Sequence, residues 1–528
     1  MRCARHTVRV RVDVVLASVC TFALHGLEAR AVTVEVDMRP GLPAFTVVGL
    51  GDAAVRESRE RVQAAIRNSG FQFPGQRLTA NLAPAHLRKV GPGFDLALAC
   101  GVLAASGQLD GERLPRFALF GELSLGGALR PCEGTLAVAE AARRAGLEGV
   151  LVAERRAAEA ALVPGLVVAG VADLAAAARV LAGGQPVSAR HRATARPVEP
   201  GWPELADVRG QGAAVRASIV AAAGGHNLLL SGPPGVGKTM LAWRLPGLLP
   251  PLTEDEAIEV SRIHSLTSPT APTGITHRRP FRAPHHSVTP AGLVGGANPR
   301  MPGEAVLAHH GVLFLDELSE FSRAALEALR QPLEDGRVAI VRATHTSVLP
   351  ARFMLVAATN PCPCGLGSDD SRCACTDADL ARHRRRLSGA LLDRLDVLVA
   401  LHRPRSRELG ERAASSTGQA RLAVLAARER QARRLGGVTR VNARMTEAEL
   451  GEHAGLDARA EALIARAYAV GLMSARAHRR ALRVARTVAD LAASERVRAE
   501  HVAEALALRH APAGAGGGLV AAGGASPP

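Results

Sequence analysis

The chain has 528 residues, of which 47% are hydrophobic and 22% charged, enough apolar material for about three domains with hydrophobic cores. This composition excludes wholesale disorder, and no run reaches the roughly 18 to 20 unbroken apolar residues of a membrane-spanning helix, so we expect a soluble protein with no membrane partner. Aromatic residues make up only 3%, so any contact with nucleic acid must be mainly electrostatic.

The formal net charge is +16, but only Lys89 and Lys238 among the 65 basic residues are lysines. A GC-rich coding bias is sufficient to explain such arginine usage, so the charge permits DNA binding without demonstrating it. A lysine in this chain instead marks a position where a compact point charge is needed.

The first predicted domain spans residues 17–182 and is of the α/β class. Val32–Val36 and Phe45–Val48 read as strands, and Ala53–Asn68 carries apolar residues at helical spacing. The preceding run, Val14–Leu24, imitates a signal peptide, but no small-residue cleavage site follows it, so we reject that interpretation. The eight cysteines do not make a disulfide framework, which favours the reducing cytoplasm.

The rest of the chain divides into four predicted parts. Residues 183–204 combine Gly, Pro and Arg without apolar periodicity, which is typical of a linker. A second α/β block follows at 205–402, and a helical domain without strand signals at 403–510. We expect the low-complexity tail 511–528 to be disordered.

The second block opens with a phosphate-binding motif. The apolar strand Leu228–Leu230 runs directly into SGPPGVGKT, which matches GxxxxGK[ST] between a strand and a helix. Backbone N–H groups of such a loop surround phosphates, Lys238 reaches the β- and γ-oxygens, and Thr239 offers its hydroxyl to Mg²⁺. The nucleotide, expected to be ATP, would contact Gly232, Pro233, Pro234, Gly235, Val236, Gly237, Lys238 and Thr239.

Two further apolar strands end in residues suited to hydrolysis. Val312–Leu315 is followed by Asp316, which would hold the Mg²⁺ shell, and Glu317, which would orient and polarise the attacking water. Asn360 follows the next strand and would hold that water from the other side. Arg394 is a candidate arginine finger for a neighbouring subunit's γ-phosphate. This pattern predicts an NTP-hydrolysing motor core, with a simple nucleotide-binding regulator as the alternative.

Four cysteines cluster just beyond Asn360. Cys362, Cys364, Cys373 and Cys375 supply the number of thiols that a tetrahedral structural Zn²⁺ needs. CxC pairs are less typical of zinc sites than CxxC pairs, so free cytosolic thiols are the alternative. A catalytic zinc is not expected, because nothing nearby supplies an acid for an open site.

With these motifs, the chain resembles the magnesium-chelatase-like AAA+ family, specifically its YifB/ComM group, from about residue 17 to 508. Matching segments include GELSL at 121–125, FRAPHH at 281–286, LEALRQPLEDG at 326–336, NPCPCG at 360–365 and SARA at 474–477. The resemblance implies a homo-hexameric ATPase ring whose ComM members drive branch migration of DNA during natural transformation. Branched or single-stranded DNA is then the implied partner.

The resemblance also implies roles for single residues. It assigns Lys238 and Thr239 to Walker A, Asp316 and Glu317 to Walker B, Asn360 to sensor 1, Arg394 to the finger and Arg476 to sensor 2. Residues 281–303 and a hairpin over 337–352 would be inserts that face the channel of the ring. Arg342 and Arg352 are then candidate phosphate-tracking residues, with solvated surface arginines as the alternative.

The N-terminal domain is similar to the Lon-protease fold (S5 domain 2-like), with one departure. Gly91-Pro-Gly93 stands where a protease has Gly-Pro-Ser, and Ala137 stands where its catalytic lysine should be. A serine–lysine dyad needs both groups, so we expect no protease substrate. Residues 1–14 precede the usual family start, which suggests a start codon placed too early. The expected fold class is thus α/β: this domain, an AAA+ P-loop ATPase core and a C-terminal helical lid.

The leading function is an ATP-driven DNA-remodelling motor. A chelatase-type motor that inserts a metal into a tetrapyrrole would share the ATPase core, but it needs a separate subunit with a metal-binding module. A non-translocating switch would use ATP only for assembly. Glu317 and Arg394 argue against the switch, because it needs neither a base nor a finger.

Overall fold

The computed structural model describes residues 15–184, 201–267, 276–296, 302–342, 345–367, 371–386, 389–410, 413, 415–471 and 473–509. They form two compact units, one within Met1–Pro197 and Ile258–Ile275, the other within Val198–Ala257 and Thr276–Pro528. Most of the predicted linker and the whole predicted tail lie outside the described residues. The predicted domain limits therefore stay predictions.

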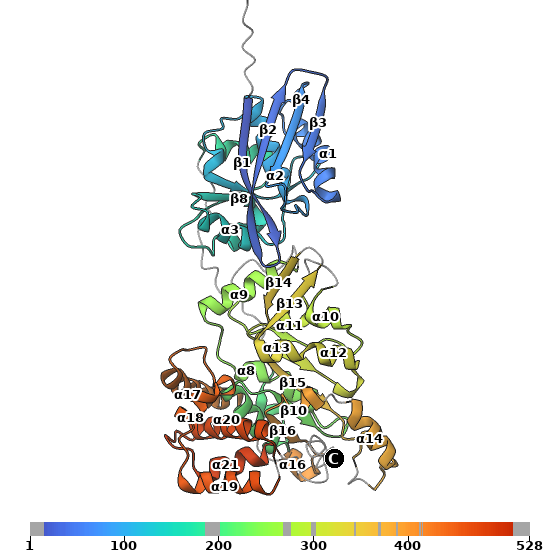
Figure 1. Ribbon diagram of the computed structural model, residues 1–528, viewed down its shortest axis with the longest axis vertical. Helices are drawn as coiled ribbons and strands as arrows, with labels where there is room; N and C mark the ends of the chain where they lie inside the picture. The colour runs from blue at the N-terminus through green and yellow to red at the C-terminus, as the bar shows by residue number, and fades with distance from the viewer. Residues whose placement is uncertain are drawn as a thin grey trace, which may run out of the picture. The chain divides into compact units, whose positions relative to one another are not determined.

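The first unit is built on a seven-stranded sheet in the order β3-β4-β2-β1-β5-β8-β9 (Figure 1). Its strands are β1 (Val15–His25), β2 (Glu28–Arg39), β3 (Ala44–Val48), β4 (Arg77–Ala83), β5 (Phe117–Leu119), β8 (Gly149–Ala153) and β9 (Val167–Val171). β1 and β2 pair antiparallel from Val15↔Met38 to His25↔Glu28. The apolar run that imitates a signal peptide therefore lies largely in a sheet strand.

Helices cover both faces of this sheet. They are α1 (Ala53–Asn68), α2 (Asp95–Ala105), α3 (Thr135–Arg144), α4 (Glu154–Ala160) and α5 (Leu174–Leu181). α1, α2 and α5 share one apolar core, while α3 and α4 share a second. α1 has its predicted bounds because Asp52 caps it by accepting a hydrogen bond from the N–H of Val55 at 3.0 Å. Short elements complete the unit: η1 (Pro92–Phe94), η2 (Leu114–Arg116), β6 (Glu122–Leu123) and β7 (Leu129–Arg130).

The two positions where a Lon-type dyad would lie are closely packed. Gly93 is buried in η1, and a Cβ atom there would lie 2.4 Å from the Phe120 ring. Ala137 is buried in α3. A serine at position 93 would therefore have to displace an aromatic core residue before it could act on anything.

The second unit contains a parallel five-stranded sheet in the order β11-β12-β15-β10-β16. Its strands are β10 (Leu228–Ser231), β11 (Phe281–Arg282), β12 (Val312–Leu315), β15 (Met354–Thr359) and β16 (Val397–Ala400). Every residue of β10, β12 and β15 is buried, as expected for parallel strands covered on both faces. The three predicted apolar strands are thus confirmed as neighbours at the centre of one sheet.

Short helices and a hairpin connect these strands. The helices are α6 (Gly212–Gly224), α7 (Lys238–Ala242), α8 (Leu245–Leu248), α9 (Glu254–Ser265), α10 (Pro290–Val294), α11 (Glu304–Leu307), α12 (Arg323–Ala328), α13 (Arg330–Asp335), α14 (Asp377–Arg386) and α15 (Gly389–Leu392), with the turns η3 (Leu205–Asp207) and η4 (Leu318–Glu320). The division between the two units falls within α9. Its last residues belong to the first unit, where Arg262 pairs with Glu140 at 2.6 Å.

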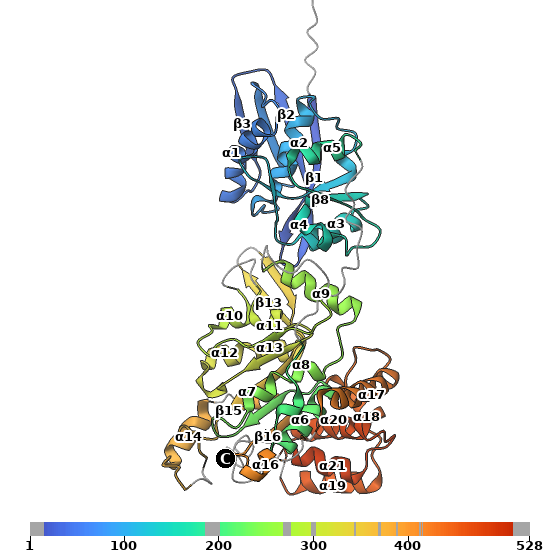
Figure 2. The same cartoon turned by 180° about the vertical axis from the view of Figure 1, so that it is seen from behind.

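The predicted hairpin is confirmed. β13 (Arg337–Arg342) and β14 (His345–Pro350) pair antiparallel, with Arg337 opposite Pro350 at the base and Arg342 opposite His345 at the tip. Within this unit, both views show the hairpin at the opposite end from helices α19 (Ala458–Ala469) and α21 (Ala499–Ala507) (Figures 1 and 2).

The C-terminal region is helical, and its described part contains no strand. It comprises α16 (Ser406–Gly410), α17 (Thr417–Leu435), η5 (Asn442–Arg444), α18 (Glu447–His453), α19, α20 (Ala475–Leu491) and α21. Buried polar contacts attach it to the core: Gln431 Nε2 donates to the carbonyl of Ala223 at 3.0 Å, and the His226 ring lies 2.8 Å from Thr487 Oγ1. These contacts fix α17 and α20 against the segment that leads into β10.

Candidate functional site

The predicted catalytic side chains follow three adjacent strands. β10 lies between β15 and β16, and β15 lies between β10 and β12, all parallel. The carboxyl ends of parallel strands meet at one edge of a sheet, and ligands bind there in open α/β folds. The phosphate loop after β10, the acidic pair after β12 and Asn360 after β15 therefore converge at this edge.

Glycines shape the phosphate loop. Gly235 and Gly237 have φ values of 77° and 97°, a left-handed conformation that side chains with a Cβ atom rarely adopt. Gly232 is required for a different reason, since a Cβ atom there would lie 2.4 Å from the carbonyl oxygen of Leu401. The loop can therefore curl its backbone N–H groups around an anion at the start of α7.

Lys238 lies inside this loop with 9% of its surface exposed. Its Nζ donates to the carbonyl oxygens of Gly232 at 2.5 Å and Pro233 at 2.9 Å, and to Asn360 Oδ1 at 2.9 Å. Burial lowers the pKa of Lys238, while the nearby carboxylates of Asp316 and Glu317 act in the opposite direction. The structure thus brings the lysine predicted for Walker A and the asparagine predicted for sensor 1 into direct contact.

Thr239 and the acidic pair form a second contact at the same edge. Thr239 Oγ1 donates to Asp316 Oδ2 at 2.6 Å, and the other oxygen of Asp316 accepts from the N–H of Glu317 at 3.0 Å. A hydroxyl and a carboxylate this close are hard oxygen ligands of the kind that Mg²⁺ prefers. The donor set therefore fits the predicted magnesium ion.

Glu317 has an unusual backbone and an unpredicted neighbour. Its φ of 51° and ψ of 54° are left-handed, which costs a non-glycine residue on the order of 1–3 kcal/mol. Its carboxylate lies 3.7 Å from the ring nitrogen Nδ1 of His286, while His285 contacts Ser287 Oγ at 2.9 Å. The only sequence signal for this contact is the FRAPHH motif, which does not indicate what its second histidine touches.

The other two predicted catalytic residues lie at different places. Arg394 follows α15, and its guanidinium is paired with Glu334 of α13. Its main-chain carbonyl accepts from Asn227 at 3.0 Å, just ahead of β10. Arg476 is exposed in the first turn of α20, a helix that contacts α6. Their predicted roles as finger and sensor 2 stay predictions.

The four cysteines converge, as expected for a metal site. Their sulfur atoms all lie within 4.8 Å of one another, and Cys362, Cys364 and Cys373 are separated by 3.2 to 3.8 Å. None of the four forms a disulfide. The pKa of the Cys364 thiol is lowered to about 6, mainly because the backbone N–H of Leu366 donates a hydrogen bond to its sulfur. A pKa this low favours a thiolate at neutral pH.

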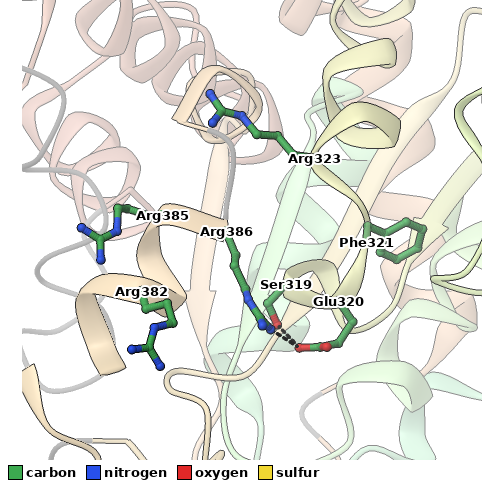
Figure 3. A pocket seen from close by; sticks show the side chains of 7 residues that line it. All are labelled: Ser319, Glu320, Phe321, Arg323, Arg382, Arg385 and Arg386. Atoms are coloured by element: carbon green, nitrogen blue, oxygen red, sulfur yellow. Dashed lines mark hydrogen bonds and ion pairs between the residues drawn. The ribbon is translucent and has the colours of Figure 1, made fainter. Parts of the chain in front are cut away.

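A basic hollow of ≈ 480 Å³ lies between the segment that follows the acidic pair and α14 (Figure 3). Its lining residues are Ser319, Glu320, Phe321, Arg323, Arg382, Arg385 and Arg386. The carboxylate of Glu320 lies 3.5 Å from Arg386 and is the single acid among these four guanidinium groups. The hollow therefore favours anions. It was not predicted from the sequence, although the arginine-rich end of α14 is a signal that could have indicated it.

The two predicted DNA-tracking arginines are not neighbours. Arg342 ends β13 at the hairpin tip, whereas the exposed Arg352 lies two residues beyond the base. Five residue steps, roughly 17 Å at about 3.4 Å each, separate tip from base. Arg352 is also held by its backbone, which donates to His309 at 3.0 Å and accepts from His310 at 2.7 Å. The two positions therefore lie at opposite ends of the hairpin.

Comparison with known proteins gives three family matches. A family described as "Magnesium chelatase, subunit ChlI" matches residues 204–409, and "Subunit ChlI of Mg-chelatase" matches residues 34–156. The third, "Magnesium chelatase, subunit ChlI C-terminal", matches residues 414–509. None of the helices in the described ranges has the length and apolarity to span a membrane.

Similar proteins occur in several bacteria. An uncharacterized protein of Mycobacterium tuberculosis H37Rv is 44% identical over 490 residues, which cover 92% of this chain and 97% of that protein. The uncharacterized protein YifB of Escherichia coli K12 is 40% identical over 497 residues (94% and 97%). The competence protein ComM of Haemophilus influenzae is 41% identical over 503 residues (94% and 97%).

Proposed function

The chain belongs to the magnesium-chelatase-like YifB/ComM family of AAA+ ATPases, and on this premise we propose that it is a hexameric motor that hydrolyses ATP to remodel branched or single-stranded DNA. One observation carries the proposal. The ends of β10, β12 and β15 bring a phosphate loop, a hydroxyl–carboxylate pair and a second carboxylate to one edge of the sheet.

Each residue at this edge has a distinct task in hydrolysis. When ATP binds, Lys238 gives up its hydrogen bonds to the loop carbonyls and donates to β- and γ-phosphate oxygens instead. Thr239 and Asp316 hold the Mg²⁺ shell, and the ion neutralises phosphate charge when bound. Glu317 orients the attacking water and accepts its proton, while Asn360 keeps Lys238 in place and contacts the same water.

The choice of DNA rests on different support. The Haemophilus influenzae relative is named a competence protein, and the hairpin β13–β14 has an arginine at its tip. Arginine is suited to phosphodiester oxygens, which it can bind without reading bases. The low aromatic content agrees with a contact of this kind.

The description of the matching families favours one alternative, a motor for metal insertion into a tetrapyrrole. The DNA motor and the chelatase-type motor can be distinguished by the rate of ATP hydrolysis. This rate is measured for the protein alone, with four-way-junction DNA added, and with a tetrapyrrole added. The proposal expects stimulation by the junction only. Stimulation by the tetrapyrrole with none by DNA would favour the chelatase-type motor, and no hydrolysis under any condition would favour the non-translocating switch.

We also propose that the four-cysteine cluster holds a structural Zn²⁺ in a protein of the reducing cytoplasm. Among the described residues the cluster consists of four cysteines and no acid, a ligand set that fits a closed, four-coordinate zinc site. The cysteines that the structure describes are all free thiols, which agrees with a reducing compartment.

The hairpin makes a separate prediction for DNA. Replacing Arg342 and Arg352 together by Ala should leave basal hydrolysis nearly unchanged and abolish both DNA stimulation and junction unwinding. Lost phosphate contacts also make the log–log dependence of DNA affinity on salt shallower, by about one to two units per engaged subunit. Because the two arginines lie at opposite ends, we expect Arg342→Ala alone to cause most of the loss.

The control must be two exposed arginines. Arg155 and Arg156 are adjacent in sequence, but Arg156 is 1% exposed and paired with Glu159 at 2.5 Å, so its removal would disturb the fold. Arg56 and Arg155 are both exposed and lie in the first unit. If Arg56→Ala/Arg155→Ala weakened DNA binding as much as the hairpin variant, diffuse charge and not the hairpin would explain the affinity.

A further inference from the structure

The sulfur geometry of the cysteine cluster is close to that of a tetrahedral metal site. Tetrahedral zinc with Zn–S bonds of about 2.3 Å separates its sulfur ligands by about 3.8 Å. The sulfur atoms are separated by 3.2 Å in Cys362–Cys364, 3.5 Å in Cys364–Cys373 and 3.8 Å in Cys362–Cys373. These distances are far from the 2.05 Å of a disulfide. The four thiols are therefore arranged around a common point and not in bonded pairs.

The loop backbone is shaped to gather these sulfurs. Gly365 and Gly367 have φ values of 85° and 91°, so the chain after Cys364 turns in a way that favours glycine. The N–H of Gly365 donates to the carbonyl of Cys362 at 3.0 Å. The N–H of Gly367 donates to the Cys362 sulfur itself at 3.2 Å, which is a second contact supporting a ligating thiolate.

The cluster also contacts the nucleotide site from two directions. A Cβ atom on Gly365 would lie 2.8 Å from Pro234 Cδ, so the cysteine loop packs directly on the phosphate loop. Asn360 lies two residues before Cys362 and binds Lys238 through its side chain at 2.9 Å. Its carbonyl contacts the His383 ring on α14 at 3.0 Å. The described residues on either side of the cysteines thus contact the phosphate loop, Lys238 and α14.

We propose that the Zn²⁺ bound by Cys362, Cys364, Cys373 and Cys375 is a positioning element of the ATPase site, which holds Asn360 and the phosphate loop together. The inference rests on the proposed zinc site and adds its consequence for hydrolysis. The ion touches no substrate. It closes the loop that carries the four cysteines, and the binding free energy of a structural zinc stabilises the fold around it.

The first test is the metal content and its replacement. The purified full-length protein should contain one zinc per chain. Exchange of that zinc for Co²⁺ should produce the strong near-ultraviolet absorption of cobalt–thiolate bonds. A protein with neither zinc nor a cobalt–thiolate band would overturn the zinc site, and the inference with it.

The second test asks whether the metal acts on the ATPase site. The variant Cys373→Ala/Cys375→Ala should lose zinc and hydrolyse ATP about 100-fold more slowly, as expected when catalytic groups shift by about 1 Å. The control Cys20→Ala/Cys132→Ala changes two cysteines of the first unit and should keep both zinc and turnover. Circular dichroism shows whether the helical content is retained. Removing zinc from the unaltered protein with a chelator, and adding it back, gives the same information without a substitution.

A double-mutant cycle separates positioning from general stability. Asn360→Ala should cause a similar loss, and its combination with Cys373→Ala/Cys375→Ala should add little, because both changes remove one positioned group. If the combined variant instead lost turnover by the product of the two separate losses, the two changes would act independently. That result would contradict the inference even if zinc is present. If the protein binds ATP without hydrolysing it, the proposed function fails. The affinity for ATP then still reports on the geometry of the phosphate loop. An unchanged affinity after zinc loss would refute the positioning role.

Discussion

Glu317→Gln should bind ATP and assemble as the unaltered protein does, but hydrolyse it at least 100-fold more slowly. The amide keeps the shape of the side chain and leaves the contacts of Lys238, Thr239 and Asp316 in place. It cannot accept the proton of the attacking water. A 100-fold loss corresponds to about 2.7 kcal/mol of transition-state stabilisation. ATP binding by calorimetry and steady-state phosphate release measure the two quantities separately.

Two control variants test whether the expected loss is specific to Glu317. Glu320→Gln changes an acid three residues away that pairs with Arg386 at 3.5 Å, and it should retain most of the turnover. Lys238→Ala should fail differently, by losing ATP affinity itself, because the proposed function makes its buried ammonium a phosphate contact. Wild-type turnover in Glu317→Gln would show that another group activates the water.

Arg394→Ala should bind ATP normally and lose nearly all turnover. Removing an arginine that stabilises transition-state charge has a large effect, on the order of a thousand-fold in related chemistry. If the finger acts in trans, mixing Arg394→Ala with Glu317→Gln should restore some activity, because some interfaces then combine an intact Glu317 with a neighbour's intact Arg394. Hydrolysis by the mixture, compared with each variant alone, is the measurement.

The ion pair of Arg394 provides the matched control. Its partner Glu334 is exposed on α13, so Glu334→Ala removes the same pair from the other side. If Arg394 is a finger, Glu334→Ala should stay active, since the guanidinium that acts on the neighbour is still present. Equal losses in both variants would mean that Arg394 matters only for this ion pair. A mixture no more active than its parents, with subunit exchange demonstrated, would indicate a role within one chain.

Local sequence signals predicted the central strands and the phosphate loop well. Continuous apolar runs that end in GKT, DE or N are what buried parallel strands require, and all three strands lie adjacent in the sheet. The scarcity of lysine was also informative. Both Lys89 and Lys238 are buried, with 0% and 9% exposed, and each donates to a main-chain carbonyl.

Contacts between distant segments could not be predicted in this way. Nothing local to His286 indicates Glu317, and nothing near Gly365 indicates Pro234, because the topology of the sheet brings these loops together. The burial of Arg156 was equally hidden, since an arginine on a short helix normally faces solvent. A resemblance to a family supplied roles, whereas the partners that hold each residue came from the structure.

The most direct measurement of the central claim follows strand exchange in a fluorescently labelled four-way DNA junction, with donor and acceptor dyes on adjacent arms. With the unaltered protein and ATP, energy transfer should change as the strands separate. With Glu317→Gln, or without ATP, the junction should be bound but not separated. The same change in energy transfer with Glu317→Gln or without ATP, or no change under any condition, would contradict a motor that uses this ATPase site to remodel DNA.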